Sequence, residues 1–124
     1  MGAVAVAPVL DVSYLVDRAH DGTLTPAQRS LYPLVVAGAA QTDASVRPAD
    51  YLHGISEDRR QALVSCRPGR TALAGQGTRP DPSMFTPTSL DARRTLQALL
   101  ARFALPRTRT SVPILAVYGS ADDI

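Results

Sequence analysis

Two short apolar runs, one near each end of the chain, limit most strongly what it can fold into. They are Ala3 to Leu10 (A-V-A-V-A-P-V-L) and Val112 to Tyr118 (V-P-I-L-A-V-Y). Neither run alternates apolar with polar residues, as a strand with one solvated face would. Such runs are typical of strands buried on both faces of a parallel sheet, and Pro113 lies near a strand start, where sheets accept proline. The sequence therefore predicts an α/β fold with two buried strands.

The first half of the intervening segment carries two helix starts. Asp11 and Ser13 offer side-chain oxygens that can cap a helical turn. Thr25 to Gln28 (T-P-A-Q) combines a threonine cap, a proline at the first helical position and a glutamine three residues after the cap. Pro33 removes one hydrogen bond from this second helix and should kink it. The apolar stripe predicted for that helix comprises Leu31, Leu34, Val35 and Ala39.

The second half predicts a helical turn at residues 48 to 52, a helix from Ser56 towards Cys66, and then a loop. Arg67 to Pro87 is assigned to the loop because it holds four prolines and three glycines in 21 residues. Ser89 then caps the clearest helix of the chain. Its apolar stripe follows the i, i+3, i+4, i+7 spacing and is expected to be buried; it comprises Leu96, Leu99, Leu100 and Phe103.

The charge pattern argues against a nucleic-acid partner. The chain of 124 residues has a net charge of +2, and all 13 of its basic residues are arginines. These arginines are spread from Arg18 to Arg109 instead of forming a stripe that could follow a phosphate backbone.

The single cysteine and the two histidines argue against a disulfide framework and against a metal site. Cys66 is the single cysteine, so no disulfide can form within the chain. His20 and His53 are too isolated to suggest metal-ligand spacing, and neither a metal nor a cofactor is expected. Residues 1 to 10 lack the basic leading region of a signal peptide and are too short to span a membrane, so no transmembrane segment is predicted and the compartment stays open.

The second apolar run ends in a turn that carries carboxylates. Gly119 allows a sharp turn, and Asp122 follows at the position where α/β folds bring reactive groups to the carboxyl edge of a sheet. A carboxylate there can orient a histidine in a Ser-His-Asp arrangement. A solvated turn is the alternative interpretation, because aspartate is common in turns.

The run V-P-I-L-A-V-Y-G-S-A-D-D-I closely resembles the acid strand of α/β-hydrolases, especially secreted bacterial lipases and esterases. The opening run G-A-V-A-V-A-P-V-L-D-V-S resembles the strand that follows the nucleophile helix in the same family. The resemblance implies that Asp122 is the catalytic acid, that Asp123 fills the neighbouring position, and that the substrate of the complete enzyme is an ester or lipid. It also implies a secreted location.

The resemblance further implies an order of parts along the chain. Residues 1–10 would form a strand of the hydrolase core, residues 11–110 a helical cap or lid, and residues 111–124 the acid strand and its turn. The two strands would be neighbours in a sheet whose other strands are missing, so the chain would be an interior fragment of the enzyme.

The departure from the family pattern is equally specific. The chain contains no Gly-x-Ser-x-Gly nucleophile elbow. The family order is serine, acid, histidine, whereas His20 and His53 both precede Asp122, so neither is expected to be catalytic. The chain is therefore predicted to be inactive unless a complementing chain supplies the missing groups. The alternative function is a stand-alone helical interaction module that self-associates or binds a protein partner through its strand edges.

Overall fold

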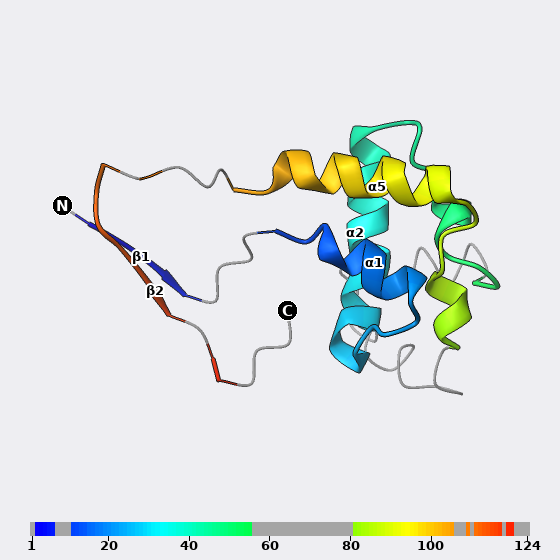
Figure 1. The fold of residues 1–124 in the computed structure, drawn as a ribbon, viewed down its shortest axis with the longest axis horizontal. Coiled ribbons are helices and arrows are strands. Elements are labelled where there is room, and N and C mark those ends of the chain that lie inside the picture. The colour runs from blue at the N-terminus through cyan, green and yellow to red at the C-terminus, as the bar shows by residue number, and fades with distance from the viewer. Residues whose placement is uncertain are drawn as a thin grey trace, which may run out of the picture.

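A computed structural model describes residues 2–6, 11–55, 81–105, 109, 111–117 and 119–120 of the chain. Within these residues a small two-stranded sheet lies to one side of a helical body (Figure 1). The arrangement is a mixed α/β one, as the sequence predicts. The predicted helix from Ser56 to Cys66 and most of the predicted loop from Arg67 lie outside the described residues.

The sheet joins segments from opposite ends of the chain. Strand β1 (Ala3–Val6) pairs with strand β2 (Ile114–Val117) in parallel, with Ala3 opposite Ile114 and Val6 opposite Val117. The predicted runs are longer than the observed strands, which are four residues each. The prediction that the two runs are neighbouring strands of one parallel sheet is confirmed.

The prediction that both strands are buried is wrong for this structure. Val4 is 69% exposed and Leu115 is 61% exposed. Parallel sheets bury both faces under helices that cross over them, and here the helical body lies beside the sheet instead of over it (Figure 1). The strands therefore have the composition of a sheet interior but the exposure of a surface.

The helical body begins with α1 (Tyr14–His20) and α2 (Pro26–Thr42). The predicted capping box of α2 is present, since the Thr25 side chain accepts from the Gln28 backbone N–H and the Gln28 side chain from the Thr25 N–H. The predicted cap of α1 is wrong in part: the Ser13 side chain makes no cap bond, and Asp11 accepts a bond from the Ser13 backbone at 2.8 Å. Gly22 lies just after the end of α1 and has a φ of 69°, a left-handed conformation that favours glycine.

The buried face of α2 is displaced from the predicted stripe. Leu31, Leu34 and Val35 are only partly buried. Pro33 lies inside the helix and is itself buried. The fully buried face is turned by about one residue along the helix, because Tyr32 supplies the largest side chain that the core takes in. The buried residues of α2 are Gln28, Tyr32, Pro33, Val36 and Ala39.

Among the described residues, two single-turn helices and one long helix follow α2. They are η1 (Pro48–Asp50), at the predicted helical turn, η2 (Pro82–Phe85), and α5 (Leu90–Phe103). The predicted cap of α5 is confirmed, since the Ser89 hydroxyl accepts from the Ala92 N–H at 3.1 Å. The sequence predicts a loop over residues 82–85, whereas the structure has a helical turn there that buries Phe85.

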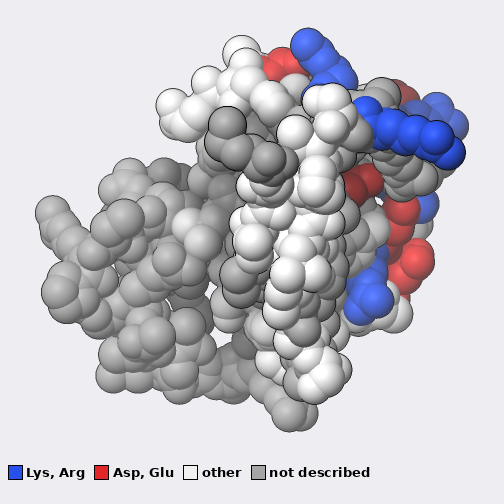
Figure 2. Space-filling view, turned by 90° about the vertical axis from the view of Figure 1, so that its left-hand side faces the viewer, with Lys and Arg blue, Asp and Glu red and all other residues white. Residues whose placement is uncertain are grey.

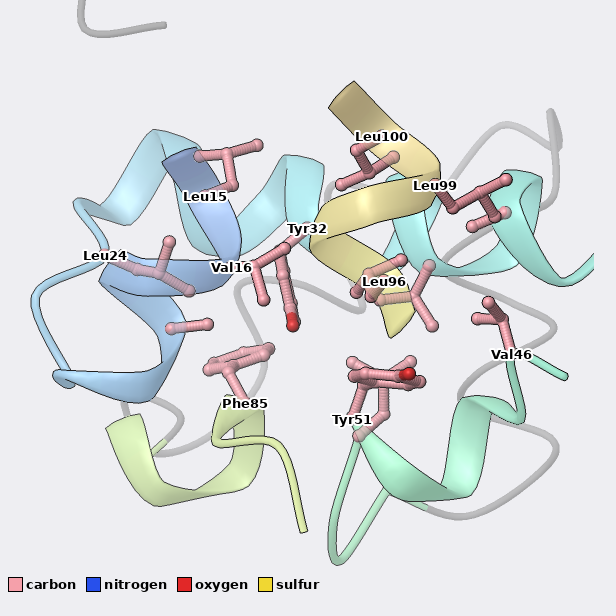
Figure 3. Close-up of a cluster of buried hydrophobic side chains, with 14 residues drawn as sticks. Leu15, Val16, Leu24, Tyr32, Val46, Tyr51, Phe85, Leu96, Leu99 and Leu100 are labelled. Atoms are coloured by element: carbon pink, nitrogen blue, oxygen red, sulfur yellow. The ribbon is translucent and has the colours of Figure 1, made fainter. Parts of the chain in front are cut away.

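The core lies entirely within the helical body (Figure 3). Tyr32 and Phe85 meet edge to face near its centre, with ring centroids 6.1 Å apart. On α5, the predicted burial of Leu96, Leu99 and Leu100 is confirmed, but Phe103 is 60% exposed. Phe103 is the last helical residue, so no helix remains beyond it to cover its ring. The buried core residues are Leu15, Val16, Ala19, Leu24, Tyr32, Val36, Ala39, Val46, Tyr51, Leu52, Phe85, Leu96, Leu99 and Leu100.

Candidate functional site

The carboxyl edge of the sheet is the place where the sequence predicts chemistry. The register ends with Val6 opposite Val117, so both strands finish at the same level. Both arrows in Figure 1 point towards the side on which the helical body lies. In α/β folds, groups that follow such strand ends share one edge of the sheet and are available to a common ligand.

The residues that follow the strands are described only in part. After β2, Gly119 and Ser120 form the beginning of the predicted turn. Asp122, the predicted catalytic acid, and its neighbour Asp123 lie outside the described residues. The assignment of Asp122 therefore stays a prediction.

Both histidines belong to the helical body. His20 is exposed at the end of α1. The Nε2 atom of His53 lies 2.7 Å from the carbonyl oxygen of Thr86, and the His53 backbone N–H donates to the Met84 carbonyl oxygen at 2.8 Å. His53 thus links the segment after η1 to η2 by hydrogen bonds, so its role here is structural. Within the described ranges, no group of three metal-ligating side chains occurs.

A polar cluster that the sequence does not predict joins α1 to α5. One carboxylate oxygen of Asp17 accepts bonds from Arg93, at 2.6 Å from Nη2 and 3.1 Å from Nε. The other accepts from the Gln97 side chain at 2.8 Å. Arg93 and Gln97 are four residues apart and so share one helix face, which is the only sequence signal for the cluster. Arg93 and Gln97 both donate to the Asp17 carboxylate, so the cluster fastens two helices together.

Two tyrosines in the core differ in how their hydroxyl groups are satisfied. The Tyr51 hydroxyl donates to the Ala92 carbonyl oxygen at 2.8 Å. The Tyr32 hydroxyl is buried and has no hydrogen-bond partner among the described residues. Burial, and then the neighbouring Tyr51, raise the pKa of the Tyr32 phenol well above its usual range. Burial and the Asp50 carboxylate likewise raise the pKa of Tyr51. Neither phenol can act as a base near neutral pH.

The helical body of the described residues thus shows hydrogen bonds that hold helices together, without a nucleophile beside a base. Comparison with known proteins gives no family assignment: no family model, curated protein or solved structure matches the chain. No helix in the described part of the chain is long and apolar enough to cross a membrane.

Proposed function

We propose that this chain is the cap and acid-strand portion of a carboxylic-ester hydrolase that uses a Ser-His-Asp mechanism. In the complete enzyme a serine attacks the ester carbonyl, a histidine takes and returns the proton, and Asp122 orients that histidine. Because the serine elbow is absent from the sequence, the chain by itself is proposed to be inactive.

The parallel pairing of β1 with β2 carries this proposal. Two strands that pair in parallel need a long crossover connection, and here the helical body supplies it. A helical cap inserted between two neighbouring strands of a hydrolase core requires the same arrangement. A stand-alone helical protein has no need of two apolar strands that pair outside its core.

The exposure of the strands supports the same proposal. Val4, Ile114 and Leu115 are apolar and largely exposed, which is costly in water and favourable inside a larger sheet. Phe103 and Leu105, where α5 leads towards β2, are also exposed. In the proposed enzyme these two side chains are available to contact acyl groups, whereas Leu96, Leu99 and Leu100 are committed to the core.

A first test measures ester hydrolysis by the purified chain. With a chromogenic short-chain ester, we expect no turnover above buffer. Turnover that copurifies with the chain through successive columns would contradict the proposal that serine and histidine come from elsewhere. The DNA on both sides of the coding segment gives an independent check, since we expect a Gly-x-Ser-x-Gly codon series upstream and a histidine downstream.

A second test uses the proposed complete enzyme and two neighbouring carboxylates. Asp122→Asn should lower kcat by about 10³- to 10⁴-fold, because the amide holds histidine in the wrong tautomer. Asp123→Asn is the matched control and should retain most activity. Equal losses in both variants, or a larger loss for Asp123→Asn, would show that Asp122 is not the acid.

A further inference from the structure

Asp21 differs from the other described aspartates in that its carboxylate is free. Figure 2 shows acidic and basic side chains gathered along the same margins of the surface in view. In the part of the chain that the structure describes, no hydrogen bond or ion pair holds the side chain of Asp21, which is exposed. It can therefore turn towards its own backbone. The aspartates that accept a hydrogen bond or form an ion pair are Asp11, Asp17, Asp43, Asp50, Asp81 and Asp91.

The residue that follows Asp21 is glycine. Asp21 caps the end of α1, and Gly22 lies in the turn that leads to α2 (Figure 1). Every other described aspartate is followed by a residue that carries a side chain, and the whole chain contains no asparagine. Because glycine has no Cβ, its amide nitrogen is not shielded from the carboxyl group of the preceding residue. The free carboxylate and the accessible nitrogen therefore occur together at this one described position.

Backbone hydrogen bonds hold this junction in the folded chain, and one of them is long. The Gly22 N–H donates to the Ala19 carbonyl oxygen at 3.3 Å, beyond the usual distance of about 2.9–3.0 Å. The Thr23 N–H donates to the Arg18 carbonyl oxygen at 2.8 Å. The Gly22 nitrogen must leave its bond before it can react with a carboxyl group. Opening of a single turn at a helix end is enough for this, and such openings need little free energy.

We propose that Asp21 is a site of spontaneous covalent modification, at which the aspartate becomes isoaspartate. The Gly22 nitrogen attacks Cγ of Asp21 in its carboxylic acid form. The amide proton and the carboxyl hydroxyl leave together as water, and a five-membered succinimide ring forms. Water then attacks the backbone carbonyl carbon of Asp21 and breaks its bond to the Gly22 nitrogen. The product has the mass of the original protein, a free α-carboxylate at residue 21 and a main chain that runs through Cγ.

Isoaspartate adds a methylene group to the main chain at a place with little room for it. A methyl group on Gly22 would lie 3.5 Å from Cβ of Pro82 in η2. Two residues after Gly22, Leu24 is buried in the core. A longer turn displaces one of these contacts, so the modified protein is less stable than the original. The proposal is independent of the hydrolase function, since it requires only this turn.

Peptide mapping after prolonged incubation tests the site. The purified chain of 124 residues is kept at physiological temperature in a mildly acidic buffer for several weeks and is then digested with trypsin. Cleavage after Arg18 and after Arg29 releases residues 19–29, in which Asp21 is the only aspartate. We expect a second species of this peptide with the same mass and a different retention time, which an isoaspartyl carboxyl methyltransferase labels from S-adenosylmethionine. Absence of this species would overturn the proposal.

Two controls locate the reaction. The peptide of residues 1–18 carries Asp11 and Asp17, whose carboxylates are engaged, and it should remain one species. Conversion there as fast as at Asp21 would refute the role assigned to a free carboxylate beside glycine. Asp21→Glu keeps the charge, but its longer side chain would have to close a six-membered ring, which is slower. This variant should give no labelled product, and labelling equal to that of wild type would also overturn the proposal.

Urea unfolding of the same aged samples tests the consequence for stability. In aged wild type, the midpoint should fall as the converted fraction rises, whereas aged Asp21→Glu should keep the midpoint of its fresh sample. Circular dichroism of the fresh variant should match wild type, because Asp21 is exposed and lies outside the core. An unchanged midpoint in a sample whose 19–29 peptide is converted would refute the loosening of the turn.

Discussion

Replacing Tyr32 with phenylalanine should make the protein more stable, which is unusual for a change at the centre of a core. In the described part of the chain the buried Tyr32 hydroxyl has no hydrogen-bond partner, while its ring packs edge to face on Phe85. Leaving such a group unsatisfied costs roughly 1–3 kcal/mol, because the bond to water in the unfolded chain is not replaced. Phenylalanine keeps the ring contact and removes only the hydroxyl. Allowing for the small gap that remains, we expect Tyr32→Phe to raise the free energy of unfolding by about 1 kcal/mol.

Tyr51→Phe is the matched control, because it removes the same atom from a satisfied site. The Tyr51 hydroxyl donates to the Ala92 carbonyl oxygen at 2.8 Å, and its loss should cost about 1 kcal/mol. The two variants therefore differ in sign and should be separated by about 2 kcal/mol.

Urea unfolding followed by circular dichroism measures both values on the same scale. In a thermal experiment the separation corresponds to roughly 8 °C between the two midpoints for a chain of this size. Tyr32→Phe that is less stable than wild type by 0.5 kcal/mol or more, on the order of one weak hydrogen bond, would refute the reasoning. That outcome would mean that the hydroxyl has a partner such as an ordered water.

The remaining predictions concern pH, capping and the independence of the helical body. The pKa of Tyr32 is raised on folding, so the free energy of unfolding should be constant with respect to this group below about pH 10 and fall by about 1.4 kcal/mol per pH unit above it. Tyr32→Phe should remove this part of the alkaline dependence and leave the part that comes from the raised pKa of Tyr51. Ser89→Ala should lower stability by about 1 kcal/mol because it removes the cap of α5, whereas Ser30→Ala, at an exposed position inside α2, should change urea stability little. Asp17→Ala should lower the free energy of unfolding by about 1 kcal/mol. In a double-mutant cycle, mutation of Arg93 should be less destabilising in the Asp17→Ala protein than in wild type, because its partner is already gone. A fragment of residues 11–105 should unfold cooperatively, since the core lies within it, and a non-cooperative melt would contradict this.

Local signals in the sequence predicted much of the helical body. The capping box at Thr25 and the cap at Ser89 depend on residues within three positions of one another, and both were found. The leucines of α5 were assigned correctly to the core from their spacing alone. Parallel pairing of the two strands was also expected, because apolar runs without alternation favour that kind of sheet.

The errors concern interactions between segments that are distant in the sequence. Burial of Phe85 depends on its contact with Tyr32, and composition around it indicated only a loop. Phe103 continues the apolar spacing of α5, but its burial depends on whether another element covers the helix end. The exposure of the strands has the same origin, because burial of a sheet face depends on other elements that pack against it, and the helical body lies beside the sheet. Asp122 lies outside the described residues, so its assignment as the catalytic acid rests on the sequence alone.

The helical body also has a consequence for how the two strands find each other during folding. Pairing Ala3 with Ile114 in an unfolded chain would require closing a loop that runs through almost the whole sequence. Once α1 and α5 are fastened by Asp17 and Arg93, the chain left to close is only that which links these helices to the strands. A roughly sixfold shorter loop lowers the entropic cost of closure by about 1.6 kcal/mol. The helices therefore act as a folding template for the strands, and the sheet should form last and open first.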